Sequence, residues 1–452
     1  MATLAGAHLG QVQRRYLPVR AKFAVALSLA VGWLMISIML GQRWVTALGE
    51  ETHPLFALFA VSFIAYIPGF MNAFLVASLL LDRRPPRQRL VIHPGVTILI
   101  AAYQEEAAIA DTLQTIATEH YPGPVEVLVL NDGSTDRTAE VAARAIKRLD
   151  FPANTDVRLI DFPVNRGKAA VLNDGLAEAR YELVVTIDGD SRLNRDALTA
   201  IVERLMSDPD NTQAVAGAVL VRNSRANLLT RAQEWDYFLG IAAVKRMQSL
   251  YQGTLVAQGA FSIYRKQALI EAGGWPDTVG EDIVLSWALL SKGYRIGYAE
   301  DAIVWTNAPT ELKQFARQRQ RWARGLIEAL NEHQSLIFKP RLTQMFIWWN
   351  LLFMPLDFAY SLIFIPGVVA ALFGIFWIAG PMTLAVLPFT ALWSLVMFRV
   401  QARMFDAQGL NVRRNPTGFL FYSLGYMFLL QPVSVWGYAA ETIGLAKKWG
   451  TK

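Results

Sequence analysis

The sequence predicts an α/β domain inserted between transmembrane α-helices, with two helices before the domain and about three after it. Four regions are too apolar for a soluble core, and the only charged residue in them is Asp357; they span 23–41, 55–81, 342–398 and 417–440. Between Leu90 and Arg341, apolar runs of strand length alternate with helical patterns. Continuous Val/Ile/Leu runs mark strands that are buried on both faces, as in a parallel sheet. The intervening segment is also long enough for one domain with its own core.

The composition narrows the class of protein. The chain contains 452 residues, of which 53% are hydrophobic and none is cysteine. It therefore has no disulfide, no thiolate nucleophile and no cysteine-based zinc site. A net charge of +6 and a pI near 9.4 could indicate nucleic acid. The basic residues cluster beside the apolar segments, however, so we expect a lipid bilayer as partner and no nucleic acid.

The apolar regions predict five membrane spans. A span needs roughly 20 apolar residues, so the third region can hold two. The expected spans are about 22–41 and 57–81 in an N-terminal section, 1–90, and about 359–379, 381–400 and 417–440 in a C-terminal section, 359–452. The section 336–358 is rich in Trp and contains Asp357, so we expect it to lie in the membrane interface. A sixth span there is the main alternative.

Basic residues predict the orientation. They precede the first span, follow the second as the linker DRRPPRQR (82–89), and follow the fourth; those outside the linker are Arg14, Arg15, Arg20, Lys22, Arg399, Arg403, Arg413 and Arg414. The positive-inside rule places all three groups, and the inserted domain, in the cytoplasm. The first span is not a cleaved signal peptide, because a second span follows at once.

The inserted domain, expected at 91–335, begins with four strand–helix units. The strands are expected at 96–103, 125–132, 156–162 and 182–190, and the helices that follow them near 106–119, 134–149, 167–180 and 195–207. Such units form a right-handed α/β fold, in which ligands bind at the carboxyl ends of the strands.

Three of these strands end in polar residues. The ends are Tyr103-Gln104-Glu105, Asn131-Asp132-Gly133-Ser134 and Asp188-Gly189-Asp190. A single strand-end Asp is usually part of a turn or a helix cap. Three such ends at one edge favour a binding site, and two carboxylates separated by one glycine could hold a metal ion that carries a phosphorylated substrate.

Other nucleotide and metal motifs are missing from the sequence. No G-x-G-x-x-G follows the first strand, so the dinucleotide-binding fingerprint is absent. The stretch NRGKAA (165–170) lacks the upstream glycine and the Ser/Thr of a P-loop, and the five histidines form no H-x-x-x-H pair. The sequence therefore argues against P-loop chemistry and zinc hydrolysis.

Two later segments add candidate site residues. Glu281 and Asp282 open a helical pattern, either as favourable acids of a first helical turn or as carboxylates placed to take a proton from a hydroxyl. A basic amphipathic helix follows at 311–330. Arg317, Arg319 and Arg324 lie among its polar positions, so the helix could lie on anionic lipid. The set Gln318, Arg321 and Trp322 would instead suit a sugar polymer and a diphosphate.

Six motifs in order carry a resemblance. They are AAYQEEAAI, VLNDGSTD, NRGKAAVLNDGL, TIDGDSRL, GEDIVLSWALL and QRQRW. The sequence resembles processive, membrane-embedded family-2 glycosyltransferases, which include cellulose, chitin and hyaluronan synthases. It is most similar to the bacterial poly-β-1,6-N-acetylglucosamine synthases. The resemblance covers essentially the whole inserted domain and the order of spans around it.

The resemblance implies a GT-A fold and a role for each candidate residue. Tyr103, Glu105 and Asp132 would hold the uridine, with Lys168 near the nucleotide. Asp188 would lie by the ribose and diphosphate and, with Asp190, would bind Mg²⁺ or Mn²⁺. Asp282, preceded by Glu281, would be the general base of an inverting displacement. Finally, the acceptor and the diphosphate would contact a set on the amphipathic helix: Gln318, Arg321 and Trp322.

The implied function is synthesis of a β-linked polymer from UDP-N-acetylglucosamine, with passage of the growing chain across a bacterial plasma membrane into a biofilm exopolysaccharide. A small membrane partner subunit is also implied. The alternatives are another product (chitin oligosaccharide, hyaluronan or β-glucan), a lipid-linked sugar transferase, or a non-catalytic transporter. The Q-x-x-R-W helix argues against the second and the intact aspartates against the third. Two residues depart from the family's pattern. Gln104 stands where the family usually has Asn, and Gly280 stands where many relatives have Thr.

Overall fold

The computed structural model describes residues 16–84, 87–251, 253–342 and 344–446. Several residues used in the predictions of the membrane sections and their orientation lie outside the described residues. They are Arg14 and Arg15, linker residues 85–86, and residues 447–452.

A mixed β-sheet forms the centre of the inserted domain. In the described residues it has eight strands in the order β3-β2-β1-β4-β7-β6-β8-β5. The strands are β1 (Val96–Ala102), β2 (Val125–Asp132), β3 (Thr155–Phe162), β4 (Leu183–Asp188), β5 (Arg192–Leu193), β6 (Thr212–Val221), β7 (Phe261–Arg265) and β8 (Arg295–Thr306). Strands β1 to β4 are mutually parallel, whereas β7 runs antiparallel to both of its neighbours. The four predicted parallel strands are confirmed.

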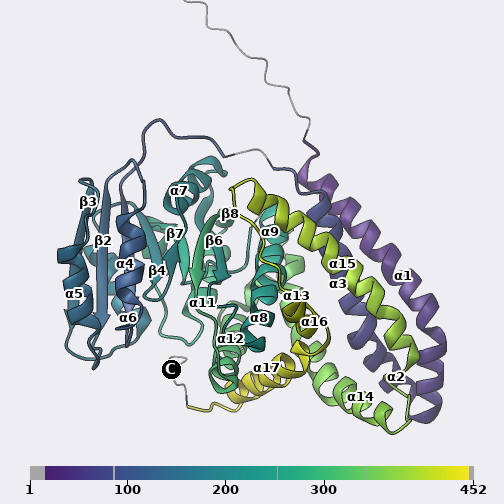
Figure 1. Cartoon of the computed structure of the whole chain (residues 1–452). Coiled ribbons are helices and arrows are strands. Elements are labelled where there is room, and N and C mark those ends of the chain that lie inside the picture. The colour runs from purple at the N-terminus through teal and green to yellow at the C-terminus, as the bar shows by residue number, and fades with distance from the viewer. Residues whose placement is uncertain (1–15, 85–86, 252, 343, 447–452) are drawn as a thin grey trace, which may run out of the picture.

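Helices cover both faces of the sheet (Figure 1). One face of β1 packs through Ile98 and Ile100, and the other through Leu99, into separate hydrophobic clusters. The first cluster includes residues of α4 (Ile109–Ala117), α5 (Thr138–Arg148) and α7 (Ala197–Ser207); the second includes residues of α6 (Lys168–Glu178), α10 (Lys266–Ala272) and α11 (Glu281–Ser291). Burial on both faces is why β1, β2 and β4 consist largely of continuous apolar runs.

Long apolar helices flank the domain. They comprise α1 (Val19–Glu51); α2 (Pro54–Val61), η1 (Ser62–Tyr66) and α3 (Ile67–Leu80); α13 (Gln344–Ala359), η4 (Tyr360–Phe364) and α14 (Ile365–Leu372); α15 (Pro381–Asp406); and α16 (Pro416–Leu424) with α17 (Tyr426–Thr442). Among the described residues, three continuous helices are long and apolar enough to cross a membrane: 19–51, 54–80 and 344–372. A fourth is possible if α16 and α17, which are bent by 50°, form one broken span.

The helix boundaries after the domain differ from those expected. The sequence places an interfacial section at 336–358 and a new span from 359, but one helical stretch runs through 344–372 without a break. Only the short η3 (Gln334–Phe338) precedes it as a separate turn. Pro355 lies inside α13 without ending the helix, which is common in membrane helices. We therefore regard 344–372 as a single candidate span.

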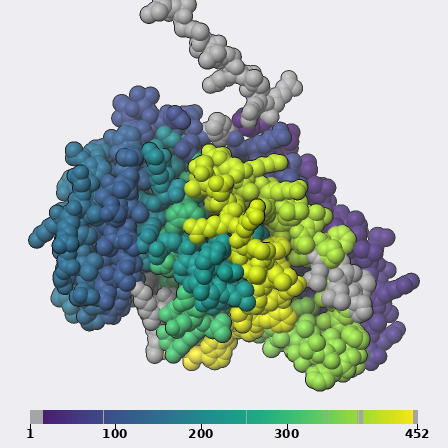
Figure 2. All heavy atoms as spheres, viewed as in Figure 1, coloured from purple at the N-terminus to yellow at the C-terminus, as the bar shows by residue number. Residues whose placement is uncertain are grey.

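A layer of helices joins the sheet to the apolar helices. It contains α8 (Leu228–Trp235), η2 (Asp236–Ala242), α9 (Ala243–Leu250) and α12 (Leu312–Glu332). α16 packs against α8, and α17 packs along α12. Figure 2 shows this close association as yellow C-terminal atoms lying directly against the teal and green atoms of the insert. The amphipathic helix predicted at 311–330 thus lies at the junction between the two parts.

Candidate active site

The three polar strand ends meet at one edge of the sheet. β1 pairs in parallel with β2 on one side and β4 on the other, and its register places Ala102 opposite Asn131 and Ala101 opposite Asp188. Parallel strands bring their carboxyl ends to the same edge. The predicted convergence is therefore confirmed.

Asp132 organises the loop that precedes α6. Its buried carboxylate accepts hydrogen bonds from the backbone N–H groups of Arg166 at 2.7 Å and Gly167 at 2.9 Å. The next residue, Gly133, has φ +60°, and a Cβ there would lie 2.3 Å from the backbone of Val164. Only glycine allows such a close approach. The contacts of Asp132 thus position the segment that carries Lys168.

The side chain of Gln104 forms hydrogen bonds that join the end of β1 to the loop after β2. Its amide Nε2 donates to Thr135 Oγ1 at 2.7 Å, and its Oε1 accepts from the Asp136 N–H at 3.1 Å. Its φ of 56° lies in the left-handed region, which Asn adopts more readily than Gln. A residue with a strained backbone therefore lies beside Tyr103 and Glu105, at the position where the resemblance predicts Asn.

Lys168 links two acidic residues that are far apart in the sequence. Its Nζ lies 2.6 Å from Asp188 Oδ1 and 3.4 Å from Glu281 Oε1. Burial opposes the charged form of the lysine, but the two carboxylates outweigh it and raise the pKa of Lys168. Burial also raises the pKa of Glu281, against the opposing charges of Lys168 and Arg321. The end of β4, the start of α6 and the start of α11 therefore share one charged cluster.

Asp282 lies beside this cluster, at the N-terminus of α11. Its Oδ1 accepts from the Ile283 N–H at 2.8 Å, and its Oδ2 accepts from the Gly259 N–H at 3.3 Å. Backbone N–H groups at a helix N-terminus favour a negative charge. The carboxylate is thus held in a fixed orientation and is half-buried.

The remaining residues of the DGD turn lie against β1 and β8. Asp190 accepts weakly from Thr306 Oγ1, at 3.4 and 3.5 Å. A Cβ at Gly189 would lie 3.2 Å from the side chain of Glu105, so Glu105 packs onto this turn. Tyr103, at the end of β1, is 46% exposed and is therefore accessible to a ligand at this edge.

Helix α12 brings Gln318, Arg321 and Trp322 to the same region. Arg321 is close enough to Glu281 for its charge to lower the pKa of that carboxyl. Within the described residues, the buried Oε1 of Gln318 has no hydrogen-bond donor. Trp322 is 38% exposed, a high value for an indole. The three side chains could therefore offer a polar group, a cation and an aromatic face to a ligand.

Two arginines of α12 are not on a polar surface, contrary to the sequence-based interpretation. Arg319 and Arg324 are 5% and 6% exposed. Arg319 pairs with Asp236 at 2.7 Å and lies over the Trp322 ring, 4.2 Å from its centroid; Arg324 pairs with Glu441 at 2.8 Å. Arg319 follows Phe315 by four residues and precedes Trp322 by three, so it belongs to the apolar stripe of the helix.

Asp236 and Lys245 also lie in this region, but the sequence patterns did not identify them as candidates. Asp236 accepts a hydrogen bond from Tyr426 at 3.1 Å as well as its ion pair with Arg319. Lys245 of α9 donates to the Val256 carbonyl at 2.5 Å, and burial lowers its pKa to about 7 despite the attraction of Asp282. An acid or a lysine inside an otherwise apolar helical face is the signal that could have identified both.

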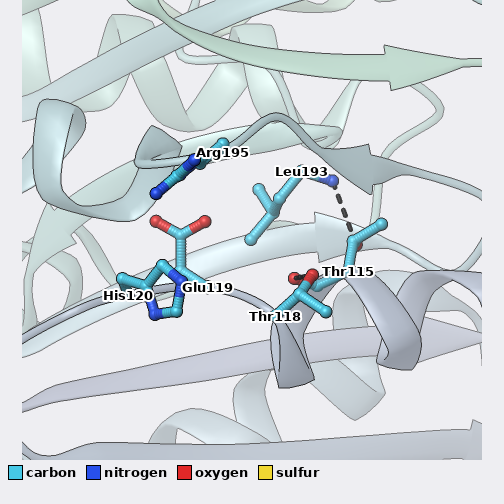
Figure 3. Close-up of a pocket in the computed structure, with 6 residues that line it drawn as sticks. All are labelled: Thr115, Thr118, Glu119, His120, Leu193 and Arg195. Atoms are coloured by element: carbon cyan, nitrogen blue, oxygen red, sulfur yellow. Dashed lines mark hydrogen bonds between the residues drawn. The ribbon is translucent and has the colours of Figure 1, made fainter.

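A cavity of about 310 Å³ lies elsewhere, near α4 and β5. Figure 3 shows its lining, which consists of Thr115, Thr118, Glu119, His120, Leu193 and Arg195. Glu119 is buried and accepts from the Leu198 N–H at 2.9 Å. Its carboxylate thus caps the start of α7, and none of the predicted site residues lines this cavity.

Known proteins show what the chain is similar to. A family model described as "Glycosyltransferase like family 2" matches residues 93–325. A poly-beta-1,6-N-acetyl-D-glucosamine synthase of Staphylococcus epidermidis is 32% identical over 280 residues, which are 60% of this chain and 66% of that protein. A synthase of the same name from Staphylococcus aureus is 35% identical over 237 residues, or 52% of this chain and 55% of that protein. The chain therefore spans less than two thirds of these curated relatives.

A solved structure agrees on the fold. The mannosyltransferase PcManGT from Pyrobaculum calidifontis, in complex with GDP-Man and Mn²⁺, aligns with a TM-score of 0.57 and 18% identity, and the alignment covers 95% of this chain and 100% of that one. At this identity the likeness shows the fold alone, a GT-A-like α/β domain. Because the family model matches more than half of its length, the chain belongs to glycosyltransferase family 2.

Proposed function

We propose that the protein is a processive, inverting β-glycosyltransferase that polymerises N-acetylglucosamine from UDP-N-acetylglucosamine. The observation that carries the proposal is the position of Asp282 beside the Lys168–Asp188–Glu281 cluster and within the electrostatic reach of Lys168. The names of the staphylococcal relatives support N-acetylglucosamine as the sugar of the polymer. Another β-linked product is tested by the same experiment.

Each residue has a role in a single displacement. Tyr103, Glu105 and Asp132, at the ends of β1 and β2, bind the uridine. Asp282 takes the proton of the acceptor hydroxyl as that oxygen attacks the anomeric carbon. The attack comes from the face opposite UDP, so the α-linked donor gives a β-linked product. The cations of Lys168 and Arg321 offset the charge that develops on the departing diphosphate.

The donor set suits a divalent cation that is shared with the substrate. Among the described residues, no three carboxylate or imidazole groups gather as metal ligands. Mg²⁺ commonly uses one or two carboxylates together with substrate phosphates, and Asp188 and Asp190 would supply these carboxylates. Bound there, Mg²⁺ or Mn²⁺ would act as a Lewis acid on the diphosphate.

The membrane helices support passage of the product as well as anchorage. Anchorage alone needs one span, whereas three helices in the described part of the chain are long and apolar enough to cross. α12, which carries the acceptor residues, packs along α17. In this proposal the domain faces the cytoplasm of a bacterium, the chain crosses the plasma membrane several times, and the polymer moves from α12 into the bundle. A small membrane subunit would bind to this bundle.

The decisive experiment is polymer formation by the purified protein in lipid, with Mg²⁺ or Mn²⁺ and a panel of UDP-sugars. We expect β-linked polymer from UDP-N-acetylglucosamine alone, none after chelation of the metal, and none from Asp282→Asn. Asp282→Asn should still bind UDP, because the uridine residues are on other elements. A requirement for two donors would indicate a copolymer. Transfer only to a lipid, or full activity of Asp282→Asn, would contradict the proposal.

A further inference from the structure

One face of α12 joins the proposed acceptor residues to the start of α11. Gln318, Arg321, Gly325 and Glu328 follow one another at intervals of three or four residues. Residues with this spacing lie on one face of a helix. The face that carries the acceptor residues therefore continues, one turn later, into a contact with the segment that carries Asp282.

Glu328 binds the backbone just before α11. Its carboxylate is 5% exposed and accepts hydrogen bonds from the Val279 N–H at 3.2 Å and the Gly280 N–H at 2.9 Å. Gly280 immediately precedes Glu281, the first residue of α11. A buried carboxylate is stable only with such donors. The Glu328 carboxylate therefore fixes the backbone from which Glu281 and Asp282 project.

Gly280 and Gly325 allow the two backbones to touch. A Cβ at Gly280 would lie 2.4 Å from the Gly325 Cα, and a Cβ at Gly325 would lie 2.7 Å from the Gly280 Cα. Neither position can take a side chain unless the two segments move apart. The contact also gives a physical reason for glycine at position 280.

We propose that Glu328, Gly280 and Gly325 form a latch that keeps Asp282 at a fixed distance from the acceptor residues of α12. The latch rests on the proposed function, because it assumes that Asp282 receives the acceptor proton. Glu328 is a positioning residue in this scheme. It sets the separation between the Asp282 carboxylate and a hydroxyl held by Gln318, Arg321 and Trp322. A shift of about 1 Å between reacting groups can slow a reaction by roughly 100-fold.

The test compares latch variants with matched controls in the full chain in lipid. The variants are Glu328→Ala, Glu328→Gln and Gly280→Ala. Glu332→Ala removes an exposed glutamate one turn further along α12, and Gly32→Ala adds a Cβ where no atom lies within 4 Å. For each protein, kcat and KM for polymer formation, the pH dependence of kcat and the Kd for UDP are measured.

We expect Glu328→Ala and Gly280→Ala to lower kcat by roughly 10- to 100-fold, to shift its pH dependence, and to leave the Kd for UDP within about twofold. Glu328→Gln should lie between the wild type and Glu328→Ala, because its amide oxygen accepts only one of the two backbone hydrogen bonds and its NH₂ group cannot accept the other. Both controls should match the wild type. A loss of UDP affinity in parallel with kcat, or a wild-type kcat in Glu328→Ala, would overturn the latch.

The latch and the proposed function can fail separately. Polymer from the wild type together with unchanged Glu328→Ala kinetics would contradict the latch and leave the function intact. Absence of polymer from the wild type would contradict the function. In that case the same variants are compared by hydrolysis of the UDP-sugar, measured as release of UDP. Asp282 would also take the proton of an attacking water, so the same order of rates is expected. If Glu328→Ala does not fold, Gly280→Ala and Glu328→Gln decide the question.

Discussion

At the scale of single residues, Lys168 is the centre of the candidate site. It is the side chain that contacts both Asp188, at the end of β4, and Glu281, at the start of α11. Without it, two acidic groups that come from different elements would repel each other at close range. A buried ion pair that loses one partner leaves an uncompensated charge, which is strongly unfavourable.

Lys168→Met should therefore weaken donor binding rather than only the chemical step. We expect the Kd for UDP-N-acetylglucosamine to rise by at least about 10-fold, because the lost cation no longer offsets the diphosphate and Asp188 loses its partner. Titration calorimetry of the purified protein measures this. Lys147→Met, on the exposed face of α5, is the control. An unchanged Kd would show that Lys168 has no contact with the donor.

Glu119 allows a second prediction at this scale, away from the site. Burial raises its pKa from 4.5 to about 7. Both the folded and unfolded forms are protonated below pH 4.5, so Glu119 then costs no stability. As the pH rises from 4.5 to 7, the unfolded state ionises first and the folded state becomes less stable. Each pKa unit corresponds to about 1.4 kcal/mol.

Glu119→Gln should remove this cost and keep the hydrogen bond from the Leu198 N–H. We expect its melting temperature to equal that of the wild type near pH 4.5 and to exceed it above pH 7, with a stability gain of up to about 3 kcal/mol. Thermal unfolding at a series of pH values measures the difference. A constant difference across this range would mean that Glu119 does not titrate with a raised pKa.

At the scale of elements, α12 connects the site to the rest of the molecule. Its Arg319 is surrounded by aromatic rings from three elements and pairs with Asp236 of η2. The guanidinium lies against one side of Trp322, whose indole remains partly exposed. A cation over an indole face is among the stronger aromatic contacts when it is desolvated. Arg319 therefore supports the indole of Trp322, which we expect to contact the acceptor sugar.

Arg319→Met should impair the use of the acceptor. It removes the cation and leaves Asp236 buried without its ion-pair partner, so Trp322 loses its support. We expect shorter polymer and at least about a 10-fold lower rate of elongation, with the Kd for UDP unchanged. Product length on gels and UDP release together measure this. Arg317→Met, on an exposed position of the same helix, should behave as wild type; equal effects of the two substitutions would contradict the role of Arg319.

The sequence predicted the bounds of the strands better than the contacts between elements that are distant in the sequence. Strand β2 was predicted at its observed bounds, 125–132, because a strand buried on both faces has a continuous apolar run. The convergence of Asp132 and Asp188 followed from parallel topology alone. The contact of Glu328 with Gly280 could not be predicted, because it depends on how α12 docks onto α11 across 48 residues of chain. The expected break at 358 failed for a similar reason: apolar composition does not show where one helix ends.

At the scale of the whole molecule, an ion-pair network joins the membrane helices to the sheet. Asp82 lies two residues after the end of α3, and its side chain is 1% exposed. It pairs with Arg84 at 2.9 Å and with Arg246 of α9 at 2.5 Å. Arg84 also lies 3.5 Å from Glu300 of β8. Burial opposes the ionised form of Asp82, but the two arginines outweigh it and hold its pKa below the usual value. The N-terminal apolar helices, the junction helices and the sheet are therefore joined by one network of ion pairs.

Asp82→Ala should separate the stability of the whole assembly from the chemistry of the site. It leaves two largely buried arginines without their shared partner, a change that typically costs about 3–5 kcal/mol. We expect a melting temperature in detergent that is lower by at least about 5 °C, with earlier proteolysis near 82–89. The exposed Asp150, replaced in Asp150→Ala, is the control. Because Asp82 is not part of the candidate site, protein that remains folded should keep the wild-type KM for the donor. A lower donor affinity without a lower melting temperature would show that the network acts on the site and not on the assembly.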